Sequence, residues 1–414
     1  MIVLSLISTS FPCFSTPSYP RKQREPLSIS PKQNQHLSLP PPSSLPPSYR
    51  TMGGTLSQLL RSTWLSNLIW TGGSLLTLGL GALYYFQDQL LYHPSIPGMP
   101  KTPRENPPGY RSPADHGIHD YEEHFIKTDD GATIHAWLLL HPNSLSLPTI
   151  VYFHGNAGNM GFRLPHGSNL FKQCRVNVLL MDYRGYGSSK GTPSEDGLLS
   201  DGRAVLAALQ AHPRVASDLI VLYGKSLGGA VALAVAEERP DDVLALVLEN
   251  TFLSIPAMVD VLMPFVKIFK GLILRIGWHS DRRVALLSQP MLFLSGLNDE
   301  LVPPAHMREL KERAMKSVWT QLYTVADGTH NDTWHRGGIA YYRTYRDFIG
   351  KVMELVEEGK VGRKAAKGGK GGGGKGVCVS GKEGGKEEEE EVVGGSIPIM
   401  SSSSLLKVPT KKNE

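Results

Sequence analysis

The sequence predicts an α/β fold, in which a mostly parallel sheet is covered by helices on both faces. From residue 149 to about residue 357, short apolar runs alternate with longer stretches of helical pattern. Runs that are apolar without interruption are typical of strands buried on both faces, and helices between them are typical of parallel strands. The six predicted strands cover residues 150–153, 176–181, 219–223, 243–248, 291–294 and 321–323.

Two further strands are predicted before the first of these. Residues 124–126 and 133–138 have β-type composition, and the turn Asp129-Asp130-Gly131 between them predicts an antiparallel hairpin. One of the intervening helices also has clear signals at its start. Thr192-Pro193-Ser194-Glu195 supplies an N-cap, a proline at the first helical position and a glutamate suited to a capping box. We therefore expect this helix to begin at Pro193.

The chain is long enough, at 414 residues, for one large domain with flanking segments. Residues 1–60 are rich in Ser and Pro, and residues 358–414 consist largely of Gly, Lys and Glu repeats. Neither segment holds enough apolar residues for a core, so both are predicted to be disordered. Between them we predict a transmembrane helix at 61–87, a linker at 88–120 and a folded domain at 121–357.

The predicted transmembrane helix rests on an uncharged stretch between Arg61 and Asp88. Residues 65–86 are mostly apolar, with aromatic residues towards the ends, and about 20 such residues suffice to cross a bilayer. Four glycines and several Ser and Thr dilute the hydrophobicity, so a buried or re-entrant helix is the alternative. Basic residues flank the stretch almost equally on both sides, which leaves the orientation open.

Charge and cysteine content narrow the classes of partner and cofactor. The formal net charge is +5, and much of it comes from lysines in the tail, so nucleic acid is not a predicted partner. The three cysteines, Cys13, Cys174 and Cys378, are too far apart for a disulfide framework or a zinc site. We predict neither a cofactor nor a metal ion, and we expect Cys174 to be a small buried side chain.

The strongest motif for chemistry is Gly224-Lys225-Ser226-Leu227-Gly228, which follows a predicted strand and precedes a helical run of small residues. A serine at such a strand-to-helix turn is held in a strained conformation that exposes its hydroxyl above the sheet. The N–H of Leu227 opens the following helix and favours negative charge on a reacting oxygen. Ser226 is therefore the predicted nucleophile, with Leu227 as one oxyanion-hole donor.

A serine hydroxyl needs a base, and the base needs an acid to orient it. Asp299 and His330 each lie just past a predicted strand, at the sheet edge where α/β active sites gather. Their order along the chain, serine then acid then histidine, is the order of many hydrolases on such folds. We predict His330 as the base and Asp299 as the acid. The alternatives are His306 or His335 as the base and Glu249 as the acid.

The second oxyanion-hole donor is expected in the loop after the strand at 150–153. This loop reads His154-Gly155-Asn156-Ala157-Gly158-Asn159, and its glycines permit a close approach of the backbone. We predict the backbone N–H of Asn156 as the donor, with Ala157 as the alternative. His154 and the turn Asp182-Tyr183-Arg184-Gly185-Tyr186-Gly187 are expected to have structural roles.

Taken together and in order, these motifs resemble the wavy-growth or bud-emergence branch of membrane-anchored α/β-hydrolases. The resemblance covers about residues 65–355, and the matching runs are 90–94, 154–159, 182–188, 224–229, 296–303 and 327–332. It implies an α/β-hydrolase domain tethered to an internal or plasma membrane, in a family sometimes labelled serine-aminopeptidase-like. We accordingly expect a single-pass protein of the endoplasmic reticulum or the plasma membrane.

Residues 253–287 are apolar and helical in pattern, and they interrupt the alternation before the strand at 291–294. They predict a small lid over the catalytic edge with an apolar pocket beneath it, although core packing could also explain them. We expect hydrolysis of acyl ester or thioester bonds in a lipid or a lipidated protein at a membrane. The alternatives are a serine aminopeptidase-like peptidase and a catalytically silent membrane scaffold.

Overall fold

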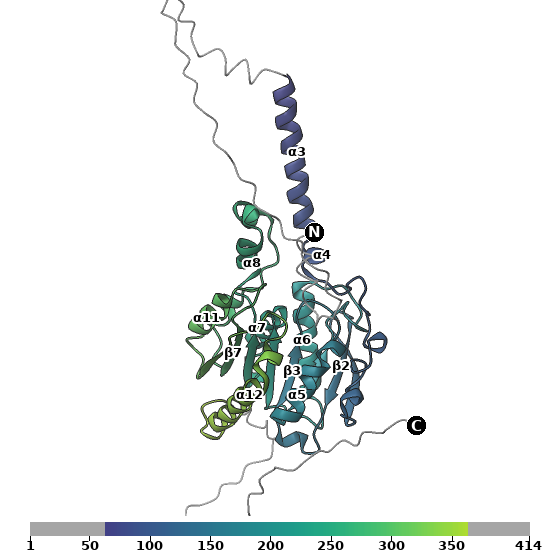
Figure 1. The fold of residues 1–414 in the computed structure, drawn as a ribbon, viewed down its shortest axis with the longest axis vertical. Coiled ribbons are helices and arrows are strands. Elements are labelled where there is room, and N and C mark those ends of the chain that lie inside the picture. Colours follow the sequence, from purple (N-terminus) through teal and green to yellow (C-terminus); the bar gives the residue numbers. More distant parts are fainter. Residues whose placement is uncertain (1–62, 363–414) are drawn as a thin grey trace, which may run out of the picture. The chain divides into compact units, whose positions relative to one another are not determined.

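The computed structural model describes residues 63–362, and an eight-stranded sheet lies at their centre (Figure 1). The strand order is β1-β2-β4-β3-β5-β6-β7-β8. The first two strands form an antiparallel hairpin, β2 pairs antiparallel with β4, and the strands from β3 to β8 run parallel. The predicted α/β fold with a mostly parallel sheet is thus confirmed. The strand bounds are Tyr121–Lys127 (β1), Thr133–Leu139 (β2), Thr149–Phe153 (β3), Asn177–Met181 (β4), Ile220–Lys225 (β5), Ala245–Glu249 (β6), Met291–Gly296 (β7) and Thr320–Val325 (β8).

Helices cover both faces of the sheet because alternate side chains of each strand point to opposite sides. In β3, Val151 and Phe153 join one buried cluster, whereas Ile150 and Tyr152 join the other. The helices of the first cluster are α6 (Glu195–Gln210), α7 (Leu227–Glu238) and α11 (Pro304–Arg313), and those of the second are α5 (Leu164–Cys174) and α12 (Thr333–Glu357). Cys174 is buried, as predicted. Short 3₁₀ turns occur at Pro103–Glu105, Pro113–His116, Ser144–Ser146, Met160–Arg163 and Pro240–Asp242.

The start predicted for α6 was two residues too early. Ser194 is the N-cap, and its hydroxyl accepts a backbone N–H of the first turn at 3.1 Å, so Pro193 precedes the helix. The carboxylate of Glu195 accepts the backbone N–H groups of Gly277 and Trp278 at 2.7 and 2.9 Å. The glutamate that suggested a capping box therefore holds a distant segment of the chain.

The apolar segment forms α3 (Thr63–Tyr85), a helix of 23 residues with no buried residue. At 1.5 Å per residue it is about 35 Å long, enough to cross a hydrocarbon layer of about 30 Å. By length and composition this helix can span a membrane, and its exposure does not fit a helix buried in a core. The disorder predicted for 1–60 and 358–414 falls almost wholly outside the described residues.

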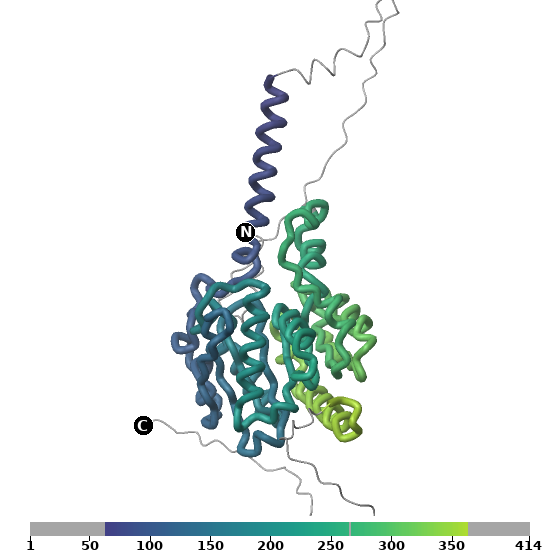
Figure 2. The backbone as a smooth tube through the Cα atoms, turned by 180° about the vertical axis from the view of Figure 1, so that it is seen from behind, coloured from purple at the N-terminus to yellow at the C-terminus, as the bar shows by residue number. Residues whose placement is uncertain are grey.

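The helical insertion lies between β6 and β7, as the sequence pattern indicated. It comprises α8 (Ile255–Leu262), a 3₁₀ segment (Pro264–Phe269), α9 (Lys270–Ile273) and α10 (Ser280–Arg283). Both views show this insertion and α4 (Gln87–Leu91) at the same end of the sheet (Figure 1, Figure 2). The side chain of Gln87 joins them, donating to the carbonyl of Ile273 at 2.7 Å and accepting the N–H of Arg275 at 2.9 Å. Two leucines near the end of α3, Leu80 and Leu83, also pack against the insertion.

Candidate active site

Ser226 occupies the turn between β5 and α7 in a strained conformation, with φ 54° and ψ −120°. Its N–H donates to the carbonyl of Glu249 at 2.9 Å, and its carbonyl accepts the hydroxyl of Thr251 at 2.7 Å. The end of the neighbouring strand β6 therefore fixes the backbone on both sides of the serine. This is the strand-to-helix turn that the sequence motif predicted.

The glycines of the motif are required by close backbone approaches. A Cβ on Gly224 would overlap the carbonyl of Gly228, and a Cβ on Gly228 would overlap the carbonyl of Phe153 in β3. Neither obstacle is a flexible side-chain end, so the backbone itself would have to shift. The turn can pass close to β3 because both positions lack a side chain.

We expect Gly228→Ala to lower the free energy of unfolding by about 2 to 3 kcal/mol, because the added methyl forces the turn away from Phe153. The matched control is Gly350→Ala, at an open position of α12 where a Cβ meets no neighbouring atom. This control should gain up to about 1 kcal/mol from the higher helix propensity of alanine. Thermal melting of both variants is the measurement, and equal shifts would contradict the close approach.

His330 and Asp299 are in direct contact. The imidazole Nδ1 lies 2.8 Å from Asp299 Oδ2, and the two side chains are 5% and 1% exposed. Asp299 Oδ1 accepts the backbone N–H groups of Leu301 and Val302 at 2.9 and 2.7 Å, which fixes the carboxylate. An Nδ1–H held by this carboxylate leaves Nε2 as the lone-pair nitrogen of the imidazole. His330 and Ser226 line one cavity, without a direct hydrogen bond between their side chains in the described structure.

Among the described residues, the alternative residues make no hydrogen bond with this pair. Glu249 accepts the hydroxyls of Tyr223 and Tyr341 at 2.9 and 2.5 Å, and its burial raises its pKa. His306 faces the backbone N–H of Leu253 at 3.5 Å, whereas His335 lies on the exposed side of α12. The structure therefore brings Asp299 and His330 into contact, whereas the hydrogen bonds of Glu249 go to two tyrosines.

The loop after β3 faces Ser226, since a Cβ on Gly155 would lie 3.7 Å from the Cβ of the serine. Within this loop the N–H of Ala157 already donates to the carbonyl of Gly155 at 2.9 Å, which removes the alternative oxyanion-hole donor in this conformation. The side chain of Asn156 is held at both ends, by the carbonyl of Leu91 and by the hydroxyl of Tyr186 at 2.8 Å. The contact with Leu91, which follows the apolar helix, was not foreseen from the sequence.

His154 and Asp182, for which the sequence predicts structural roles, are in contact with this loop and its neighbours. Asp182 Oδ1 accepts the N–H of Met160 at 2.6 Å and lies 3.8 Å from His154 Nε2. Both side chains are fully buried, and burial lowers the pKa of His154 to about 3 and raises the pKa of Asp182 to about 7. The hydroxyl of Tyr183 donates to the carbonyl of His154 at 3.0 Å.

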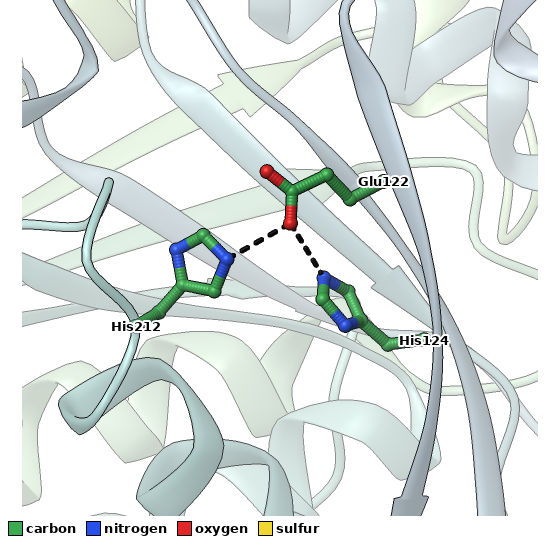
Figure 3. A group of neighbouring side chains, drawn as sticks. All are labelled: Glu122, His124 and His212. Atoms are coloured by element: carbon green, nitrogen blue, oxygen red, sulfur yellow. Dashed lines mark hydrogen bonds and ion pairs between the residues drawn. The ribbon is translucent and has the colours of Figure 1, made fainter.

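A second cluster of titratable groups lies on β1 and on the turn after α6 (Figure 3). Glu122 Oε2 lies 2.9 Å from His212 Nε2 and 3.2 Å from His124 Nε2. The backbone N–H of Arg214 donates to His212 Nδ1, so Nε2 of His212 carries the proton that Glu122 accepts. A metal ligand needs a lone pair at that nitrogen. Since the Arg214 guanidinium also lies 3.3 Å from Glu122, these contacts describe an ion-pair cluster that ties β1 to the turn.

The cavity beside Ser226 has a volume of about 310 Å³ and combines three parts of the chain. The candidate catalytic edge supplies its polar end, including both predicted oxyanion-hole residues, Asn156 and Leu227. The insertion supplies much of its apolar wall, and the end of α3 with α4 supplies the rest. The apolar lining residues include Leu83, Leu90, Leu91, Phe252, Ile255, Met258, Val259, Leu262, Met263, Val266, Ile273, Leu274 and Ile276.

Two comparisons with known proteins match part of the chain. A family model described as "Serine aminopeptidase, S33" matches residues 147–279. Among solved structures, the esterase Pf2001 of Pyrococcus furiosus is 20% identical with a TM-score of 0.48, covering 58% of this chain and 94% of the esterase.

The similarity to curated proteins extends over most of the chain. Protein bem46 of Schizosaccharomyces pombe is 38% identical, with 66% of this chain and 89% of bem46 covered. An uncharacterized membrane protein of Saccharomyces cerevisiae is 36% identical over 69% of this chain and 97% of its own length. The alpha/beta hydrolase domain-containing protein WAV2 of Arabidopsis thaliana is 35% identical, with 73% of this chain and 99% of WAV2 covered. The chain therefore belongs to the α/β-hydrolase family that includes WAV2 and bem46.

Proposed function

We propose that this chain is a membrane-anchored serine hydrolase that cleaves acyl ester or thioester bonds through an acyl-enzyme intermediate. The observation that supports it best is the joint placement of Ser226 and His330 at one end of an apolar cavity, with Asp299 behind the histidine at 2.8 Å. A strained serine, a base fixed by an acid and an apolar acyl site are the parts that such chemistry requires.

In the proposed reaction, Ser226 Oγ attacks the acyl carbonyl carbon while His330 Nε2 takes the hydroxyl proton. The negative charge on the carbonyl oxygen is stabilised by the backbone N–H groups of Leu227 and Asn156. The bond to the alcohol or thiol breaks, and His330 returns the proton to that leaving group. Water, deprotonated by the same imidazole, then attacks the acyl carbon. The bond from this carbon to Ser226 Oγ breaks, His330 returns the proton to Oγ, and the acid leaves. Asp299 orients His330 and stabilises its charged form throughout.

The walls of the cavity support a substrate with an acyl chain. Each buried methylene contributes about 0.8 kcal/mol, so an apolar pocket favours longer chains over acetyl groups. Leu83, Leu90 and Leu91 lie on the wall, which joins the end of the candidate membrane helix directly to the acyl site. A lipid or a lipidated protein in the same bilayer would be held at high local concentration by such an anchor. The endoplasmic reticulum and the plasma membrane remain the proposed locations.

A serine aminopeptidase-like activity is the second candidate, and the description of the matching family model favours it. A peptidase of this kind needs a carboxylate to hold the amine of its substrate. The described residues that line the cavity include no aspartate or glutamate. The lining therefore supports an ester or thioester substrate over a free amino terminus, and the paired Asp299 and His330 argue against a silent scaffold.

We expect Leu262→Asp to lower the ratio of turnover efficiencies for octanoyl and acetyl nitrophenyl esters by about tenfold, the equivalent of two buried methylenes. Leu262 lines the cavity, so the aspartate would put a charge against the acyl chain. The matched control is Leu272→Asp, in the same insertion but 74% exposed and outside the cavity lining. Both variants and the wild type are measured in detergent.

Three outcomes of this experiment would contradict the proposed acyl pocket or the proposed function. A wild type that shows no preference for the longer ester would contradict the acyl pocket. Faster cleavage of aminoacyl amides than of any ester would replace the proposed function with the aminopeptidase. An equal loss of preference in Leu262→Asp and Leu272→Asp would show that the insertion responds to charge in general, and not through its contact with the chain.

A further inference from the structure

Arg163 is a positively charged residue of the cavity lining that has no role in the proposed reaction. It ends the 3₁₀ turn Met160–Arg163 and precedes α5, and its side chain lines the cavity together with Ser226 and Asn156. One guanidinium nitrogen, Nη2, donates to the carbonyl of Ala157. The Nε atom is buried and has no hydrogen-bond partner among the described residues. No carboxylate in this part of the chain lies within 4.0 Å of the guanidinium.

The nearby carboxylates are engaged elsewhere. Asp299 binds His330, Glu249 accepts two tyrosine hydroxyls, and Asp182 accepts the N–H of Met160. Burial also raises the pKa of Asp182 to about 7 and the pKa of Glu249, which weakens both as counter-charges to Arg163. Asp182 attracts Arg163 from beyond contact distance, since the arginine lowers the pKa of this carboxyl against the effect of burial. A half-buried cation with no carboxylate in contact is nevertheless costly, because water no longer solvates it fully and no anion in contact replaces that water.

A second cation lies on the same lining. The ammonium of Lys225 donates to Asn331 Oδ1 at 3.0 Å, and burial lowers its pKa to about 8. The cavity is thus apolar where the insertion and α4 form its wall. Near Ser226 it is lined by two basic side chains, Arg163 and Lys225, and of these the Lys225 ammonium is attracted by Glu249 and Asp299. A ligand that matches both ends is an amphiphile with an apolar chain and a negative group close to the scissile bond.

We propose that Arg163 binds an anionic oxygen group, a carboxylate or a phosphate, on the alcohol or thiol portion of the acyl substrate. This inference rests on the proposed function and specifies its substrate class. The acyl chain occupies the apolar wall, so the charge belongs to the leaving group. A guanidinium with an unpaired Nε–H can give charge-assisted hydrogen bonds to the oxygen atoms of either a carboxylate or a phosphate.

The test compares substrates that share an octanoyl chain and differ in charge, using the full chain in detergent. Octanoyl lysophosphatidic acid is paired with monooctanoylglycerol, and 2-(octanoyloxy)propanoate is paired with its methyl ester. The release of octanoate gives kcat/KM for each substrate. We expect the wild type to prefer the anionic member of one pair. The pair that shows this preference identifies the anion as phosphate or carboxylate.

We expect Arg163→Met to lower the anionic-to-neutral ratio of kcat/KM by about 10- to 100-fold, mainly through KM, because hydrogen bonds between charged partners contribute about 1.5 to 3 kcal/mol. Arg163→Lys should restore part of the ratio, because it keeps the charge and loses the planar fork. The matched control is Lys172→Met, which removes an exposed cation from α5, the helix that follows Arg163, and should leave the ratio unchanged.

Two outcomes would overturn this inference while the proposed function stands. The first is a wild type that hydrolyses both members of each pair equally well. The second is an equal fall for anionic and neutral substrates in Arg163→Met, which would mean that the arginine acts only by holding Ala157 and its loop. If the wild type hydrolyses none of these substrates, binding can still be measured without catalysis. Calorimetric binding of the same pairs to Ser226→Ala should still favour the anion, and equal affinities would reject the anion site itself.

Discussion

Ser226→Ala is expected to abolish labelling by a fluorophosphonate probe and to lower turnover by at least roughly 10⁴-fold. The probe forms a bond with an activated serine oxygen, and the strained turn at Ser226 presents its hydroxyl to the cavity that His330 also lines. Alanine keeps the backbone of the turn and removes the reacting atom alone. Labelling on a gel and hydrolysis of octanoyl nitrophenyl ester measure the two effects.

A suitable control is Ser295→Ala, because Ser295 is also a buried serine at a strand end but does not line the cavity. Its hydroxyl has no hydrogen-bond partner among the described residues, so the substitution should cost little stability. This variant should be labelled like the wild type. His330→Ala should lose turnover to an extent similar to Ser226→Ala, since the hydroxyl then keeps its proton at neutral pH. Equal labelling of Ser226→Ala and the wild type would reject the nucleophile.

The fold could be predicted because its signals are local. Buried strands such as Thr149–Phe153 are apolar without interruption, and this pattern is visible in a few residues. The ends of helices are harder to predict where two neighbouring residues both carry a capping signal. Thr192 and Ser194 can both cap a helix, and the position of Glu195 decided in favour of Thr192. That glutamate instead binds backbone N–H groups more than 80 residues away, which a local pattern does not reveal.

At the candidate site, too, local signals could be predicted and contacts between distant segments could not. Ser226, Asp299 and His330 could be chosen because each follows a predicted strand, and parallel strands bring such positions to one edge. The contacts of Gln87 with Ile273 and of Asn156 with Leu91 join segments 186 and 65 residues apart, and no local pattern predicts them. The insertion was recognised as apolar, yet Leu272 is 74% exposed, because a helical pattern does not show which face meets the cavity.

The choice of acid can be tested with Asp299→Asn and Glu249→Gln, which change charge and keep shape. Asp299→Asn should lower turnover by roughly 10⁴-fold, the size of the effect known for the corresponding change in serine proteases. The amide no longer stabilises the charged imidazole, and its N–H₂ favours the wrong tautomer of His330. Its remaining oxygen can still accept the N–H groups of Leu301 and Val302, so the melting temperature should change little.

Glu249→Gln should behave differently, because the carboxylate of Glu249 contacts Tyr223 and Tyr341 and makes no hydrogen bond with His330 in the described structure. A neutral amide oxygen can accept the same hydroxyls, and burial already disfavours the charged form of this glutamate by raising its pKa. We therefore expect its turnover to stay within about tenfold of the wild type, since one neutral hydrogen bond contributes about 1 kcal/mol. A larger loss in Glu249→Gln than in Asp299→Asn, at matched melting temperatures, would transfer the role of the acid to Glu249.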